Sequence, residues 1–119
     1  MTETLKNKQF DLEERTFNFA RLVCDYVNKL PKTITNIEIG KQLTRSAGSV
    51  GANYIEANES LGKKDFIMRI KISRKEAKES RYWLNLSAPD NKNIKIQQDL
   101  VRESTELMNI FGAILNKSQ

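Results

Sequence analysis

The chain contains no histidine and a single cysteine, Cys24, among its 119 residues. With no imidazole and one thiol, zinc or haem lacks a ligand set and a serine triad lacks its histidine base. Two carboxylate pairs at i,i+3, Glu56 with Glu59 and Glu103 with Glu106, resemble half of a di-iron site, but such bundles also need Glu-x-x-His motifs. We therefore expect no metal, no cofactor and no enzymatic activity.

Long apolar runs are also missing. No stretch approaches the roughly 20 residues needed to span a bilayer, and the polar N-terminus has no signal-peptide pattern. A single cysteine excludes an intrachain disulfide and is typical of proteins in a reducing cytoplasm. With 39% hydrophobic and 29% charged residues, the composition fits a globular protein. The length predicts one domain over residues 1–119, in the cytoplasm.

Apolar residues recur at three- and four-residue steps in four segments, which is the period of an amphipathic helix. The predicted helices cover residues of about 11–30, 36–61, 64–87 and 95–116. Pro31 and Pro89 fall between helices, and Thr35 with Glu38 fits a capping box at the start of the second. Short connections favour an all-α, antiparallel up-down-up-down four-helix bundle.

The second predicted helix contains Gly40, Gly48 and Gly51, each of which costs roughly 0.5–1 kcal/mol relative to alanine. Gly40 and Gly51 share one line with Thr44 and Ala47, and small residues on one line let a neighbouring helix approach closely. A phosphate-binding glycine loop is the alternative, but no Walker pattern or preceding strand accompanies these glycines. The core stripe of this helix is predicted to be Ile39, Leu43, Ala47, Val50, Tyr54, Ala57 and Leu61.

The third predicted helix holds the charge excess. The net charge is +5, and residues 63–81 contain eight Lys or Arg against three Asp or Glu, whereas the rest of the chain is balanced. This asymmetry favours a polyanionic partner. The alternative is a solvated surface partly offset by acids, with Lys75 and Glu79 as an i,i+4 pair. Five cations project to one side of the helix at ~100° per residue: Lys71, Arg74, Lys75, Lys78 and Arg81.

The same helix carries a second apolar sector, which a helix in an isolated bundle rarely needs. We interpret this sector as a subunit interface, formed by Met68, Ile72, Trp83 and Leu86. Arg45 and Glu56, on the polar side of the second helix, are predicted to pair between neighbouring protomers. Phe10, Phe17 and Cys24 are spaced by sevens and either broaden the core or face another subunit.

One ordered set of residues runs through the second and third predicted helices. It comprises Gln42-Leu43, Arg45-Ser46, Ser49-Val50-Gly51-Ala52-Asn53-Tyr54, Glu56-Ala57, Lys63-Lys64-Asp65-Phe66-Ile67, Ile72, Lys75-Glu76-Ala77, Glu79 and Tyr82-Trp83-Leu84. This set resembles the bacterial four-helix-bundle proteins of the 23S ribosomal RNA intervening-sequence type, to which the accessory protein of diversity-generating retroelements is related. Ile55 and Gly62 depart from the commoner form of the family, in which arginine and serine are frequent.

The resemblance implies a homopentamer arranged around a central channel. In the retroelement branch, the assembly resembles a basic scaffold that binds nucleic acid and a reverse transcriptase. We therefore predict a non-enzymatic, oligomeric scaffold that binds RNA or another nucleic acid through the basic side of the third helix. The alternative is a structural or protein-interaction module that recruits a partner enzyme, such as a reverse transcriptase, without itself binding nucleic acid.

Overall fold

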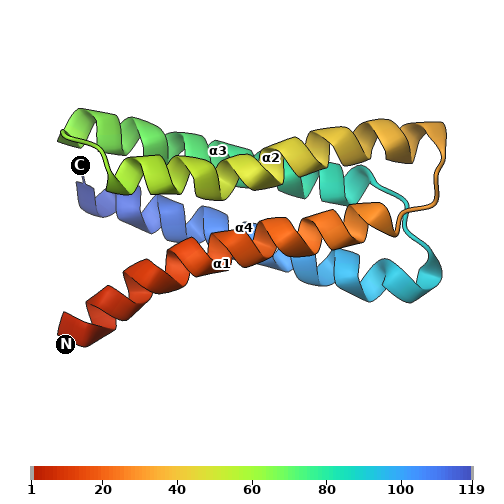
Figure 1. Cartoon of the computed structure of the whole chain (residues 1–119), viewed down its shortest axis with the longest axis horizontal. Coiled ribbons are helices and arrows are strands. Elements are labelled where there is room, and N and C mark those ends of the chain that lie inside the picture. The colour runs from red at the N-terminus through yellow and green to blue at the C-terminus, as the bar shows by residue number, and fades with distance from the viewer. Residues whose placement is uncertain (1, 119) are drawn as a thin grey trace.

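The computed structural model describes the backbone of residues 2–118 and the side chains of residues 12–118. The described part is all-helical, without strands, and measures 45 × 27 × 19 Å. Its elements are α1 (Thr2–Asn28), α2 (Ile34–Asn58), α3 (Lys63–Leu86), the 3-10 turn η1 (Asn91–Asn93) and α4 (Ile94–Ser118). Figure 1 shows the α1–α2 and α3–α4 connections at one end of the molecule and the α2–α3 connection at the other. The prediction of four packed helices is confirmed.

The starts of the first two helices differ from the sequence prediction. α1 begins at Thr2, well before the predicted start near residue 11. α2 begins at Ile34, because the side chain of Thr33, rather than Thr35, accepts a hydrogen bond from the Asn36 amide at 3.2 Å. The capping residue therefore lies two positions earlier than the predicted capping box places it.

The end of α2 also differs, with a consequence for its core stripe. α2 stops at Asn58, and Gly62 caps the start of α3 in an extended conformation with φ of −142°. Leu61 therefore lies in the connection and is fully exposed, so its assignment to the core stripe was wrong. The other six members of that stripe, from Ile39 to Ala57, are buried as predicted.

Small polar residues allow α2 and α3 to pack closely. Ser46 and Ser80 are fully buried, and their hydroxyl oxygens lie 2.8 Å apart. The buried Ser73 donates to the backbone carbonyl of Val50 at 3.0 Å. Every buried side-chain N or O atom among the described side chains has a hydrogen-bond partner, so burying these hydroxyl groups leaves no unsatisfied polar group.

The glycines of α2 divide into two kinds. A Cβ atom on Gly51 would lie 2.9 Å from Thr16 Oγ1, and one on Gly40 would lie 2.9 Å from Val27 Cγ1. Both neighbours belong to α1, so the predicted close approach is confirmed at these two positions and the approaching helix is α1. A Cβ atom on Gly48 would meet nothing within 4 Å. The helix-propensity cost of Gly48 is therefore not offset by any contact within the described chain.

Two buried tyrosines are expected to lower the free energy of unfolding at alkaline pH. Burial raises the pKa of Tyr26, whose hydroxyl lies 2.6 Å from Ser87 Oγ, and burial also raises the pKa of Tyr54. An acid with a raised folded pKa ionises first in the unfolded chain, so we expect stability to be full below pH of about 10 and to fall above it. The measurement is the free energy of unfolding in urea at a series of pH values between neutral and strongly alkaline.

Phenylalanine variants test whether these two tyrosines cause the loss of stability at alkaline pH. Tyr26→Phe and Tyr54→Phe should each flatten the alkaline decline, whereas Tyr82→Phe, at an exposed position, should leave it unchanged. A decline of unaltered steepness in the Tyr26→Phe/Tyr54→Phe double variant would contradict the assignment.

Candidate nucleic-acid interface

The five predicted cations of α3 lie on its outer side and lean toward α4. Lys71, Arg74, Lys75 and Lys78 are exposed, while Arg81 is half-buried and donates from Nη1 to Thr105 Oγ1 of α4 at 3.2 Å. The guanidinium carbon of Arg74 lies 3.8 Å from the position that a Cβ atom on Gly112 of α4 would occupy. The row of cations therefore follows the seam between the two helices. We refer to these five residues as the basic row.

A groove of about 510 Å³ lies along this seam. Its lining contains four cations and no acidic residue. The α3 wall consists of Lys71, Arg74, Lys75 and Lys78, and the α4 wall consists of Met108, Gly112, Leu115 and Asn116. Sequence patterns did not indicate the α4 wall, because the register between two helices is absent from the periodicity of either one.

Two acids of α3, Glu76 and Glu79, point to the opposite flank of that helix. Arg45 Nη1 lies 3.4 Å from both carboxylate oxygens of the buried Glu76, and Arg45 Nη2 bonds to Glu79. Trp83 Nε1 also donates to Glu79, at 2.9 Å. Glu76 and Glu79 therefore face α2, whereas the basic row faces α4. No ion pair among the described side chains includes a residue of the basic row, so the predicted Lys75–Glu79 pair is not formed.

Two acids of α4, Glu103 and Glu106, also pair with an arginine of another helix. Arg15 of α1 binds both oxygens of Glu103, at 2.7 and 2.8 Å, and reaches Glu106 at 3.1 Å. The hydrogen bond to Glu103 is the largest of the effects that raise the pKa of Arg15. Both carboxylates, those of Glu103 and Glu106, are thus bonded to the Arg15 guanidinium group. Among the described residues, no group of three His, Cys, Asp or Glu side chains could hold a metal ion.

The predicted interface sector of α3 is only partly open. Met68 and Leu86 are about half exposed, at 48% and 53%, whereas Ile72 and Trp83 are half-buried, and Trp83 packs against the core of its own chain. Tyr82 is 60% exposed and lies edge-to-face against Trp83, with 5.0 Å between ring centroids. The assignment of this sector to a subunit interface stays a prediction.

The other predicted interface residues differ in whether they already have partners within the chain. Arg45 already has its two glutamate partners within the chain, and Glu56 is exposed without an ion pair among the described side chains. An Arg45–Glu56 contact between protomers therefore stays a prediction that would require Arg45 to share its guanidinium group. Phe17 and Cys24 are exposed, so they do not broaden the core, and the side chain of Phe10 lies outside the described residues.

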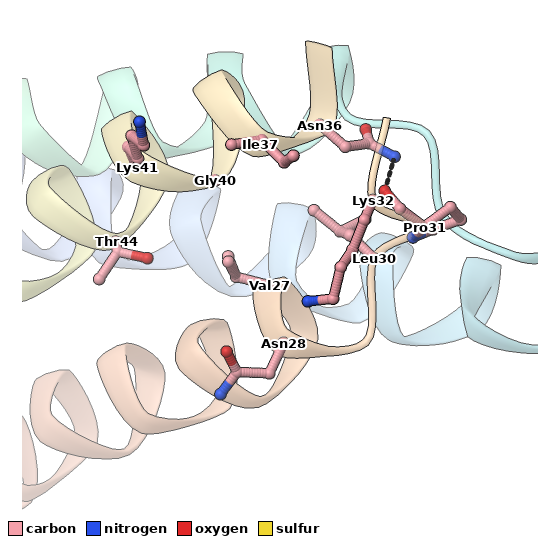
Figure 2. Close-up of a pocket in the computed structure, with 10 residues that line it drawn as sticks. All are labelled: Val27, Asn28, Leu30, Pro31, Lys32, Asn36, Ile37, Gly40, Lys41 and Thr44. Atoms are coloured by element: carbon pink, nitrogen blue, oxygen red, sulfur yellow. Dashed lines mark hydrogen bonds between the residues drawn. The ribbon is translucent and has the colours of Figure 1, made fainter. Parts of the chain in front are cut away.

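A second hollow lies where the end of α1 passes the start of α2 (Figure 2). The Asn36 side chain, buried at its edge, donates to the carbonyls of Pro31 and Ala88 at 2.9 and 3.0 Å, and its own oxygen accepts from the Ala88 amide at 3.0 Å. Asn36 thereby ties the α1–α2 connection to the α3–α4 connection. The polar atoms of Asn36 are therefore engaged in structural hydrogen bonds.

Comparisons with known proteins place this arrangement in a family. The family model described as "23S rRNA-intervening sequence protein" matches residues 8–116, which is most of the chain. The chain belongs to the 23S rRNA-intervening sequence protein family. The resemblance seen in residues 42–86 is thereby confirmed as far as this family is concerned. The relation to the retroelement accessory protein stays an expectation.

A solved structure shares the fold of this family member. It is the crystal structure of a protein of unknown function from the S23 ribosomal protein family of Bacteroides thetaiotaomicron VPI-5482. The two chains are 26% identical and superpose with a TM-score of 0.74, over 92% of this chain and 98% of the other. No curated protein matches the chain. None of the described helices is both long and apolar enough to cross a bilayer.

Proposed function

We propose that this protein is a non-enzymatic scaffold that binds RNA or another nucleic acid through the basic row of α3. The supporting observation is the separation of charge across that helix. Glu76 and Glu79 are held by Arg45 on the α2 flank, while the cations on the α4 flank have no acidic partner among the described side chains. Unpaired cations in one row attract phosphates through sequence-independent, salt-sensitive contacts.

The assembly forms part of the same proposal. We propose an antiparallel up-down-up-down bundle, which is supported by the connections at alternating ends in Figure 1. We also take the chain to be one domain acting in the cytoplasm. We further propose a homo-oligomer, with the pentamer that the family resemblance implies as the expected form. Several copies of the basic row on one assembly would multiply weak phosphate contacts through avidity. Sedimentation equilibrium tests this part, and a monomer at micromolar concentration would refute it.

Neutralising the basic row should abolish most nucleic-acid binding. The variant Lys71→Gln/Arg74→Gln/Lys78→Gln/Arg81→Gln removes four cations per chain, and we expect affinity for a structured RNA to fall at least ~10-fold at low salt. The slope of log affinity against log salt should also become shallower, by roughly 0.7–0.9 for each phosphate that the variant no longer neutralises. Filter binding over a salt series measures both quantities.

A matched control distinguishes the effect of the basic row on RNA affinity from the effect of a lower net charge. Four lysines that are exposed and lie outside the groove, changed together to glutamine, should lower affinity much less: Lys29, Lys32, Lys92 and Lys117. Equal losses in the two variants, or salt-independent binding by the natural protein, would contradict the proposal. Circular dichroism and solution mass should be unchanged in both variants.

A protein-interaction module is the second candidate. The exposed side chains of Met68, Tyr82 and Leu86 lie on the outer side of α3 beside the basic row and favour this candidate. Such a module would recruit a partner enzyme, for example a reverse transcriptase, and leave nucleic acid to that partner. Absence of RNA retention at low salt by the natural protein is the result expected of this candidate.

A further inference from the structure

The two walls of the α3–α4 groove differ in chemistry. The α3 wall presents the cations Lys71, Arg74, Lys75 and Lys78, whereas the α4 wall presents apolar atoms of Met108 and Leu115, the backbone at Gly112 and the amide of Asn116. The cations of α4 do not line the groove. Two of these, Lys95 and Arg102, pair with Asp99 at 3.1 and 3.4 Å. A ligand in this groove therefore meets positive charge on one side only.

We propose that this groove binds one unpaired nucleic-acid strand, with its phosphates along α3 and its bases against α4. The inference rests on the proposed function and specifies the class of nucleic acid that the basic row takes. An unpaired strand has the matching asymmetry, because its charge runs along one edge and its base faces are open on the other. In a duplex, stacking between successive base pairs covers the base faces, and phosphates line both edges of each groove.

The spacing of the cations fits successive phosphates of one strand. Lys71, Arg74 with Lys75, and Lys78 recur at about one helical turn, which is ~5.4 Å along the axis. This interval is comparable with the separation of neighbouring phosphates along a single strand. From Lys71 to Lys78 the row covers two such intervals, or ~10 Å. One groove therefore accommodates roughly three nucleotides, and several copies in an assembly would hold a longer strand.

The α4 wall can receive bases without selecting their sequence. The thioether of Met108 is polarisable and makes favourable contacts with aromatic rings, and Leu115, which is 7% exposed, adds a small apolar surface. Every base has an aromatic face, so contacts of this kind tolerate any sequence. Gly112 lets the α4 backbone lie close to Arg74, whose guanidinium carbon is 3.8 Å from the position that a Cβ atom there would occupy. The Arg74 guanidinium group thus covers Gly112, and a base beside it would stack on the planar face of that group.

Blocking the groove at Gly112 tests the inference while keeping every cation. Gly112→Gln places a long neutral side chain in the groove, and replacing glycine within a helix favours the helical state, so the fold should persist. Gly112→Ala is the matched control, because its Cβ atom makes only an ordinary contact with Arg74. The probes are a fluorescent unpaired RNA of about twelve nucleotides, the DNA strand of the same sequence, and each strand annealed to its complement.

We expect the natural protein to bind at least one unpaired strand ~10-fold more tightly than the corresponding duplex in fluorescence anisotropy. Gly112→Gln should lose at least ~5-fold in that affinity, with Gly112→Ala nearly unchanged. Equal or tighter duplex binding, or full single-strand binding by Gly112→Gln, would overturn the inference while leaving the basic row as a phosphate-binding surface. Absence of binding to every probe at low salt would overturn the proposed function together with it.

Discussion

Replacing Gly51 with alanine is expected to destabilise the protein by about 2 kcal/mol, whereas the same change at Gly48 should stabilise it by about 0.5–1 kcal/mol. Both residues lie inside α2, so both variants gain helix propensity. They differ in what the new methyl group meets. At Gly51 it would lie 2.9 Å from Thr16 Oγ1 and 3.2 Å from Thr16 Cβ, but at Gly48 it meets nothing within 4 Å.

The collision at Gly51 cannot be relieved cheaply. Thr16 is 1% exposed, and its hydroxyl donates to the Glu13 carbonyl at 3.0 Å. Rotation about χ1 would move Thr16 Oγ1 but not Thr16 Cβ, which lies 3.2 Å from the new methyl group, so relief requires α1 to move away from α2. Overpacking of this kind typically costs about 1–3 kcal/mol, which exceeds the ~1 kcal/mol gained from replacing a helical glycine.

Urea denaturation followed by circular dichroism, at one fixed protein concentration, measures both variants. Adding Thr16→Ala to Gly51→Ala removes the closest atom and should recover part of the loss. Destabilisation of similar size at Gly48 and Gly51 would contradict the packing account. It would indicate that the outer side of α2 at Gly48 is also covered, as a contact between protomers would cover it.

Arg45→Met is expected to destabilise the protein by about 2–3 kcal/mol. Glu76 is 7% exposed and has Arg45 as its charged partner across the α2–α3 seam. Removing one member of a buried pair typically costs about 3–5 kcal/mol, because the remaining charge is left uncompensated. The expected value is lower here because the Arg45 side chain is itself 48% exposed and partly screened by water.

Two further variants distinguish charge from packing. Arg45→Met/Glu76→Leu removes both charges and should recover most of the stability, because an apolar pair can replace a buried ion pair at little cost. Lys41→Met, on the same helix, breaks an exposed pair with Glu38 and should change stability by no more than about 0.5 kcal/mol. The measurement is the same urea denaturation. A double variant as unstable as Arg45→Met would refute the uncompensated charge as the cause.

Sequence periodicity predicted which side of each single helix is buried and which is exposed. The buried line of α2 through Leu43, Val50 and Tyr54 followed from three- and four-residue spacing, since burial repeats with the helical period. The outward direction of Lys71 and Lys78 followed for the same reason. Leu61 was misplaced because its exposure depends on where α2 ends, which is decided by local turn and cap geometry.

Features that require two helices in register could not be predicted. Arg45 was expected to pair with Glu56 of a neighbouring protomer, and its partners within the chain, Glu76 and Glu79 across the seam to α3, were not foreseen. The α4 wall of the groove at Gly112 was missed for the same reason. Single-sequence spacing contains no information on how one helix is shifted along another, so only packing of the helices determines which charged groups meet.

The hydrogen bonds of the Asn36 side chain make the two ends of the bundle differ. At one end its side chain joins both inter-helix connections. At the other, the chain from Glu59 to Gly62 passes between α2 and α3 with the fully exposed Leu61 at its tip. Exposed loop tips tolerate inserted sequence best. A purification tag or fluorescent reporter therefore belongs between Leu61 and Gly62, and the proline-bounded end should be left intact in any engineered form.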